Sequence, residues 1–169
     1  MISPAAVTLR DGRSVTLAPL GAPDEAEVAR LLDALADPRA AFFARAAAGR
    51  GHAGARGELV AHTPDGELAG YAAWIAEDGG STGECAGAVD PRFTAVGLGT
   101  VLLRRGARDA LDAGLSTLCV ELHPGSRALA AMLRDCGLQT QWDLDYPVVH
   151  VNLSLGTRRP GWQTPVAAA

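Results

Sequence analysis

The sequence contains no lysine, so all fifteen of its basic residues are arginines. Nineteen acidic residues leave the chain with a net charge of −4 at pH 7. A protein that binds nucleic acid without a specific motif needs an excess of positive charge on its surface. The charge balance therefore argues against nucleic acid as a partner.

Cysteine is scarce, and long apolar runs are missing. The three cysteines, Cys85, Cys119 and Cys136, are odd in number, lie within apolar segments and form no C-x-x-C pair. This usage indicates reduced thiols and a cytoplasmic location. The first residues lack the pattern of a secretory signal, and no run approaches the roughly 20 apolar residues of a membrane span. We therefore expect no membrane partner. The four histidines show no ligand-like spacing, so we expect no metal.

The hydrophobic content of 48% over 169 residues is enough for one domain with a proper core. We expect that domain to span residues 1–156, followed by a C-terminal tail over 157–169. Periodicity and turn residues predict strands over 15–20, 58–62, 67–76, 84–89, 118–122 and 148–155, and helices over 24–35, 40–48 and 126–136. A further helix is expected after the glycine turn, with an apolar stripe from Val101 to Leu111 and its end at Gly114. A loop is expected over 49–57. The order strand, helix, strand after residue 84 predicts a parallel pair of strands.

The most informative segment runs from residue 84 to residue 103, where a strand passes through a turn with Gly97 and Gly99 into a helix. Such a turn gathers backbone N–H groups at a helix N-terminus, where they can hold a pyrophosphate. A dinucleotide fingerprint would need a third glycine where Leu102 stands, and a P-loop would need a lysine. Neither of those nucleotide motifs is present.

The segment resembles the acyl-CoA signature of the GNAT superfamily of N-acyltransferases, in which a strand ends four residues before Gln/Arg-x-x-Gly-x-Gly/Ala. Val89 ends the strand here, Thr94 takes the Gln/Arg position, and Gly97 and Gly99 take the two small positions. Relatives often carry Gly-Arg at residues 95–96, where this chain has Ala-Val. The resemblance implies acetyl-CoA as cosubstrate, bound through backbone amides. The residues expected at the cofactor are Ala88, Val89, Thr94, Ala95, Val96, Gly97, Leu98, Gly99, Thr100 and Ser126.

The resemblance covers about residues 8–155. Within it, the segment 11–20 is similar to the opening of the Pat-type bacterial protein-lysine acetyltransferases. In the second motif, Ser126 takes the usual asparagine position, and Leu133 stands where many relatives have a tyrosine general acid. The implied fold is α/β: a mixed, twisted sheet splayed between two central parallel strands and flanked by helices. The implied acceptor is a protein lysine or a small amine, and the protein is expected as a monomer or homodimer.

An amine acceptor must lose a proton before it attacks a thioester, and a lysine side chain is only about 0.04% neutral at pH 7. Glu84 matches the position of the glutamate base in the Pat-type resemblance, and partial burial would make it a better proton acceptor. Its plain alternative is a solvated carboxylate at a strand end. A backbone N–H near Ala88 or Val89 is expected to stabilise the oxyanion.

Three further residues have a functional and a structural interpretation. Tyr146 is a candidate for the general acid that Leu133 cannot supply, but a tyrosine beside a proline also packs well. His123 is a candidate auxiliary base, although a strand-end histidine bonded to backbone is the simpler interpretation. Ser126 contacts cofactor or acts as a helix N-cap. The departures at Thr94, Ser126 and similar positions also leave open a catalytically degenerate domain that binds acyl-CoA as a sensor or regulatory subunit.

Overall fold

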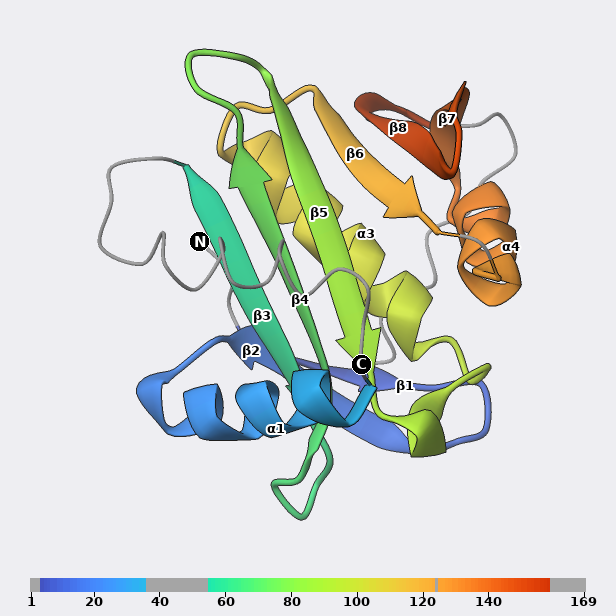
Figure 1. Cartoon of the computed structure of the whole chain (residues 1–169). Coiled ribbons are helices and arrows are strands. Elements are labelled where there is room, and N and C mark those ends of the chain that lie inside the picture. Colours follow the sequence, from blue (N-terminus) through green and yellow to red (C-terminus); the bar gives the residue numbers. More distant parts are fainter. Residues whose placement is uncertain (1–3, 36–54, 124, 159–169) are drawn as a thin grey trace.

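The computed structural model describes residues 4–35, 55–123 and 125–158, which form one eight-stranded sheet with helices on both faces (Figure 1). The strand order across the sheet is β1-β2-β3-β4-β5-β6-β8-β7. The strands are β1 (Ala5–Thr8), β2 (Ser14–Pro19), β3 (Arg56–His62), β4 (Leu68–Ala76), β5 (Thr82–Val89), β6 (Thr117–Leu122), β7 (Leu138–Asp145) and β8 (Val148–Arg158).

Strands β1 to β5 form an antiparallel meander. The turn between β3 and β4 closes on Gly66, whose φ of 86° suits a residue without a side chain. In β4 the residues from Leu68 to Trp74 are all buried, because helices cover both faces of the sheet at this position.

Two helices cover opposite faces of this part of the sheet (Figure 1). A short 3₁₀ turn, η1 (Ala22–Asp24), leads into α1 (Glu25–Leu35), whose Val28 packs with Tyr71 and Ala88 on one face. On the other face, α3 (Leu98–Asp112) packs Leu102 against Leu59. Each helix thus buries the apolar stripe that its sequence predicts.

The C-terminal part continues the sheet beyond β6. Helix α4 (Arg127–Asp135) buries Leu133 and is followed by the β7–β8 pair. Strand β8 pairs antiparallel with β6 from Thr117↔Ser154 to Leu122↔Val149. A buried apolar cluster that includes Trp74, Leu118 and Leu153 joins this part to Ala107 and Ala110 of α3.

Strands β5 and β6 are the only parallel neighbours in the described part of the sheet, and they pair at three positions alone. The pairs are Thr82↔Thr117, Gly83↔Leu118 and Glu84↔Cys119. Beyond Glu84 the two strands part toward their carboxyl ends (Figure 1). The expected mixed sheet with a splay between two central parallel strands is therefore confirmed, and the splay begins at Glu84.

The sequence-based elements that fall within the described residues are confirmed to within a few residues, with two omissions. Strands β1 and β7 were not among the expected elements. Strand β7 has the sequence LQTQWDLD, in which Leu138, Thr140, Trp142 and Leu144 alternate with polar residues, so the alternation typical of a half-buried strand is present although the strand was not predicted. The expected helix over 40–48 and most of the loop over 49–57 lie outside the described residues, as does most of the expected tail, while β8 continues to Arg158. In the part of the chain that the structure describes, no helix is long and apolar enough to cross a bilayer.

Candidate functional site

A cavity of about 670 Å³ opens where β5 and β6 separate. Its walls come from the carboxyl half of β5, the neighbouring parts of β4 and β6, the turn before α3, α3 itself and α4. Most lining side chains are small or apolar, which is typical of a site for an organic ligand with a long, flexible arm. Residues that line it include Cys85, Ala86, Gly87, Ala88, Val89, Thr94, Ala95, Gly97, Gly99, Thr100, Leu103, Met132 and Asp135.

The turn that enters α3 has an unusual backbone. After the 3₁₀ turn η2 (Pro91–Phe93), Ala95 has a φ of 62° and Gly97 a φ of 94°, so two residues lie in the left-handed region. Alanine pays a steric cost there, whereas glycine does not. These two residues bend the chain so that it enters α3 directly from the cavity wall.

The N-terminus of α3 presents backbone amides at the cavity. The first intrahelical bond is donated by the Val101 N–H to the Gly97 carbonyl at 3.1 Å. The N–H groups of residues 98–100 precede that bond and have no acceptor within the helix. Gly99 and Thr100 line the cavity, so these amides and the positive end of the helix dipole face the space that a phosphate would occupy.

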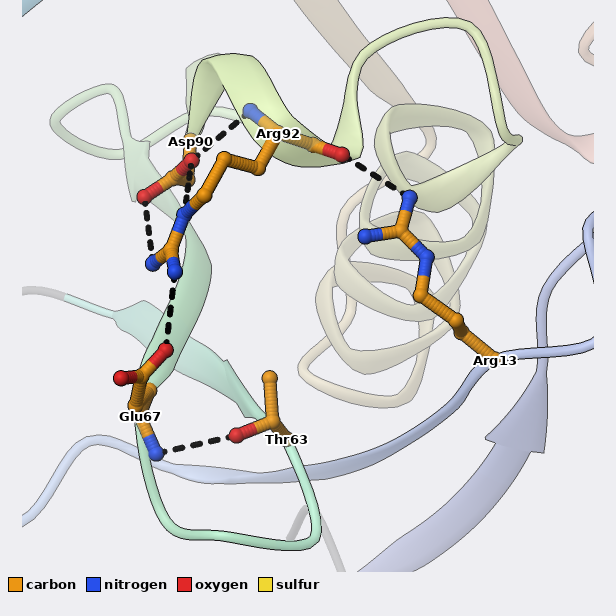
Figure 2. A network of polar contacts seen from close by, with 5 residues as sticks. All are labelled: Arg13, Thr63, Glu67, Asp90 and Arg92. Atoms are coloured by element: carbon orange, nitrogen blue, oxygen red, sulfur yellow. Dashed lines mark hydrogen bonds and ion pairs between the residues drawn. The ribbon is translucent and has the colours of Figure 1, made fainter.

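A polar network fixes the segment in front of this turn (Figure 2). Asp90 accepts hydrogen bonds from the backbone N–H of Arg92 at 2.8 Å and from its guanidinium at 3.1 Å. The Arg92 guanidinium also contacts Glu67 at 2.9 Å, which ties η2 to the β3–β4 hairpin. Hydrogen bonding from Arg92 holds the pKa of the Asp90 carboxyl below its usual value.

The β1–β2 connection contacts the same turn from the other side. Arg13 donates a hydrogen bond to the Arg92 carbonyl at 2.8 Å (Figure 2) and lies over the Phe93 ring at 4.1 Å. The Arg10 N–H donates to the Val96 carbonyl at 3.0 Å, and the Thr94 hydroxyl donates to the Pro91 carbonyl at 2.7 Å. The turn is thus held in its bent form by the protein itself.

Strand β5 directs alternate amides to opposite sides. The Asp90 N–H donates to the Ala69 carbonyl of β4 at 2.9 Å, and the register pairs Val89 with Gly70. In an antiparallel ladder, residues two apart direct their N–H groups to the same side. The amide of Ala88 therefore points to β4, and the amide of Val89 points toward the splay. Of the two expected oxyanion donors, the geometry favours Val89.

Glu84 lies at the start of the splay, on the sheet face opposite α3. It shares that face with Ala86 and Ala88, because side chains alternate along a strand. Its side chain is half-buried, and it is not among the residues that line the cavity. The expected base thus lies on β5, on the sheet face opposite α3, whereas the expected cofactor turn follows the carboxyl end of β5 and leads into α3.

Polar groups surround Cys119, the partner of Glu84 across the strand pair. Its Sγ atom lies 3.7 Å from Nδ1 of His150 on β8. Burial raises the pKa of the Cys119 thiol, and the negative charges of Glu84, Glu121 and Glu77 raise it further. These carboxylates make the face beside the splay acidic, and they keep the thiol protonated and a poor nucleophile.

The structure brings together most, but not all, of the expected cofactor residues. Ala88, Val89, Thr94, Ala95, Gly97, Gly99 and Thr100 line the cavity. Val96 packs in the core beside Phe93, and Leu98 is fully buried there. Ser126 is the N-cap residue of α4, although its hydroxyl makes no capping bond, and it does not line the cavity.

Two of the remaining candidates lie apart from the cavity. Tyr146 is 96% exposed in the β7–β8 turn and does not line the cavity. His123 follows β6, and its Nε2 atom lies 3.8 Å from Glu121. Among the described residues that Nε2 atom is buried without a hydrogen-bond partner, so the expected bond to backbone is not seen there.

Sequence reasoning missed several residues of the cavity wall. Met132 of α4 approaches the α3 N-terminus so closely that a Cβ atom on Gly99 would lie 3.1 Å from its sulfur. Gly99 therefore lets the two helices approach each other. Arg10 also lines the cavity, although it lies more than eighty residues before the glycine turn. No local signal in the sequence connects Arg10 to that turn.

Comparisons with known proteins agree with this geometry. A family model described as an acetyltransferase (GNAT) domain matches residues 23–134. The fold is similar to the GNAT domain of S. lividans PAT, with 20% identity over 89% of this chain and 96% of that chain and a TM-score of 0.73. It is also similar to yncA from Salmonella typhimurium, solved with its cofactor acetyl-CoA (18% identity, 86% and 96% covered, TM-score 0.64).

A third similar structure is spermidine N-acetyltransferase from Vibrio cholerae in complex with CoA and spermine. Its identity to this chain is 13%, with 83% of this chain and 95% of that chain covered and a TM-score of 0.65. Among curated proteins, none matches the chain in sequence. At these identities, the structural similarities establish the fold.

Proposed function

We propose the acceptor for this chain, which belongs to the acetyltransferase (GNAT) domain family and is an acyl-CoA-dependent N-acetyltransferase. The proposed acceptor is a primary amine, and the preferred one is the side chain of a protein lysine. We further propose that Glu84 is the general base. The observation that carries this proposal is the splay between β5 and β6, which opens beside Glu84 and leads to the amides at the α3 N-terminus.

The residues around the cavity suit acetyl-CoA. The amides of residues 98–100 and the α3 dipole suit a pyrophosphate, and the small, apolar wall from Ala86 to Val89 suits the pantetheine arm. The arm would then run along β5 in place of a neighbouring strand. That path passes the Val89 amide, which is directed away from β4.

The charges on the far side of the splay support an amine acceptor. Glu84, Glu121 and Glu77 lie close enough to Cys119 to raise its pKa, so three carboxylates gather on this side of the splay. A protonated amine is attracted there by long-range electrostatics. One of the similar structures, spermidine N-acetyltransferase from Vibrio cholerae, was solved in complex with spermine, which is an amine. The lysine assignment rests on the Pat-type resemblance.

The proposed reaction needs one base and one oxyanion donor. Glu84 takes a proton from the ammonium group, and the neutral amine attacks the thioester carbon. The Val89 amide stabilises the negative charge on the thioester oxygen as the C–N bond forms. The C–S bond then breaks, and the second amine proton leaves with the sulfur as CoA thiol. Proton removal alone is worth about 4.6 kcal/mol for a lysine at pH 7.

The test is release of CoA thiol from acetyl-CoA in the presence of an amine panel. We expect thiol release with lysine-containing peptides and an acetyl group on the lysine by mass spectrometry. Release with spermidine alone would replace the lysine assignment by a polyamine. If the protein bound acetyl-CoA but released no CoA thiol with any amine, an enzymatic role would be contradicted. A domain that binds acyl-CoA as a sensor would then be the remaining interpretation. Because the chain has no lysine, its own side chains add no background acetyl-lysine to this assay.

A further inference from the structure

Arg10, in the connection between β1 and β2, lies against the turn that enters α3. The backbone N–H of Arg10 donates a hydrogen bond to the Val96 carbonyl at 3.0 Å. A Cβ atom added to Gly97 would lie 3.4 Å from the Nε atom of Arg10 and 3.5 Å from its Cγ atom. The arginine side chain therefore crosses directly over Gly97, and it forms part of the cavity wall.

The charge of Arg10 is available at this position. Its side chain is exposed, and among the described residues no carboxylate forms an ion pair with it. Asp135 is the one carboxylate among the described residues of the cavity wall. Arg104, on the same helix as Gly99, is a second nearby cation. Burial lowers its pKa, and the positive charge of Arg10 contributes in the same direction.

The turn itself offers no cation. Its residues from 94 to 97 are Thr, Ala, Val and Gly, so every basic group near the α3 N-terminus comes from elsewhere in the chain. Backbone amides alone bind a phosphate through partial charges, whereas a guanidinium adds a full charge and several donors in a planar fork. A cation beside the amides would complete the site.

We propose that Arg10 binds a phosphate of CoA, and thereby replaces from the β1–β2 connection the positive charge that the α3 turn lacks. The inference rests on the proposed binding of acetyl-CoA in this cavity. The group recognised is a phosphate ester or diphosphate, and CoA offers two such sources, the diphosphate and the 3′-phosphate of the ribose.

The connection is held rigidly enough to present Arg10. The Leu9 N–H donates to the Arg13 carbonyl at 2.7 Å, and buried Leu9 packs in the same core set as Phe93 and Leu98. Arg13 in turn fixes the connection to the Arg92 carbonyl (Figure 2), and its guanidinium lies over the Phe93 ring. Arg10 is therefore placed by its neighbours on both sides, which lowers the entropic cost of holding a ligand.

The experiment compares Arg10→Gln with the unaltered protein and with Arg108→Gln, a control at an exposed position on α3. Isothermal titration gives Kd for acetyl-CoA and for 3′-dephospho-acetyl-CoA, and acetyl-pantetheine is compared by kcat/KM. We expect Arg10→Gln to weaken acetyl-CoA binding about tenfold, to leave kcat/KM for acetyl-pantetheine unchanged, and to leave Tm of the free protein within about 1 °C. Arg108→Gln should change none of these. Arg10→Lys should restore part of the affinity.

The dephospho ligand identifies the phosphate. If Arg10→Gln also binds 3′-dephospho-acetyl-CoA about tenfold more weakly than the unaltered protein, Arg10 contacts the diphosphate. If the two proteins bind the dephospho ligand equally, Arg10 contacts the 3′-phosphate. Equal acetyl-CoA affinity in Arg10→Gln and the unaltered protein would overturn the proposal. An equal loss for acetyl-pantetheine would also overturn it, because Arg10 would then only shape the turn. Failure of the unaltered protein to bind acetyl-CoA at all would instead refute the proposed function.

Discussion

Glu84 and Cys119 are the last residues that pair β5 with β6, and the cavity opens directly beyond them. The pair therefore marks the point where a cosubstrate can enter between the strands. It also places a half-buried carboxylate at the mouth of that opening, on the face away from α3.

The carboxylate side is tested by Glu84→Gln. Glutamine keeps the shape of the side chain but cannot take a proton, so we expect kcat to fall about 100-fold with a lysine peptide. Kd for acetyl-CoA should stay within twofold, because Glu84 does not line the cavity. Steady-state kinetics and titration calorimetry measure the two quantities.

A matched control is Asp112→Asn, which removes a carboxylate near the end of α3 that pairs only with Arg108 among the described residues. It should leave kcat unchanged. If Glu84→Gln kept full activity at every pH, another group would have to deprotonate the amine.

The thiol side is tested by alkylation of Cys119 with iodoacetamide at pH 8. Only the thiolate reacts, and burial together with the charges of Glu84 and Glu121 raises the thiol pKa, so alkylation should be slower than that of an ordinary thiol. Glu84→Gln removes one of those charges and lowers the pKa. We therefore expect faster alkylation of Cys119 in that variant. Peptide mass spectrometry measures the rate of alkylation. An unchanged rate would show that Glu84 does not face Cys119.

The turn before α3 is tested by a pair of opposite substitutions. Gly97→Ala puts a side chain at a φ of 94° and against Arg10, and should destabilise the protein by about 1–2 kcal/mol and weaken acetyl-CoA binding. Ala95→Gly relieves an alanine at a φ of 62° and should stabilise by about 0.5 kcal/mol after the added entropy of glycine. Urea unfolding measures both. Destabilisation by Ala95→Gly would argue against the left-handed turn.

The network of Figure 2 is tested by the pH dependence of Asp90→Asn. The pKa of Asp90 is lower in the folded state than in the unfolded state, so its charge stabilises the fold above the usual value of 3.8 and that stability is lost as pH falls below it. At pH 7 the variant should lose about 1 kcal/mol of unfolding free energy. Near pH 2.5 the two proteins should converge. A difference that is constant with pH would show that the lost contact is not ionic.

The sequence alone predicted the parts of this protein that are encoded locally. The hairpin at Gly66, the apolar stripe of α3 and the glycine turn each depend on a few adjacent residues. Strand β7 was not predicted although its residues alternate between half-buried and exposed positions from 138 to 143, and its place beside β8 follows from the pairing of the two strands.

The site divides in the same manner. The stretch from Ala88 to Thr100 could be predicted, because its spacing is local and resembles a known signature. The position of Arg10 depends on the β1–β2 connection folding onto a turn more than eighty residues later in the chain, which no short pattern records. Tyr146 was chosen by its position in sequence, and only the structure shows that it is 96% exposed.

The central claim is that main-chain amides at the splay and at the α3 N-terminus hold acetyl-CoA. An NMR titration of the ¹⁵N-labelled 17.4 kDa protein with acetyl-CoA tests it most directly. The account predicts saturable changes that are largest at the amides of Val89, Gly97, Gly99 and Thr100, with little change along β1 or at the far end of α3. Saturable binding that leaves those four amides unmoved would contradict the account.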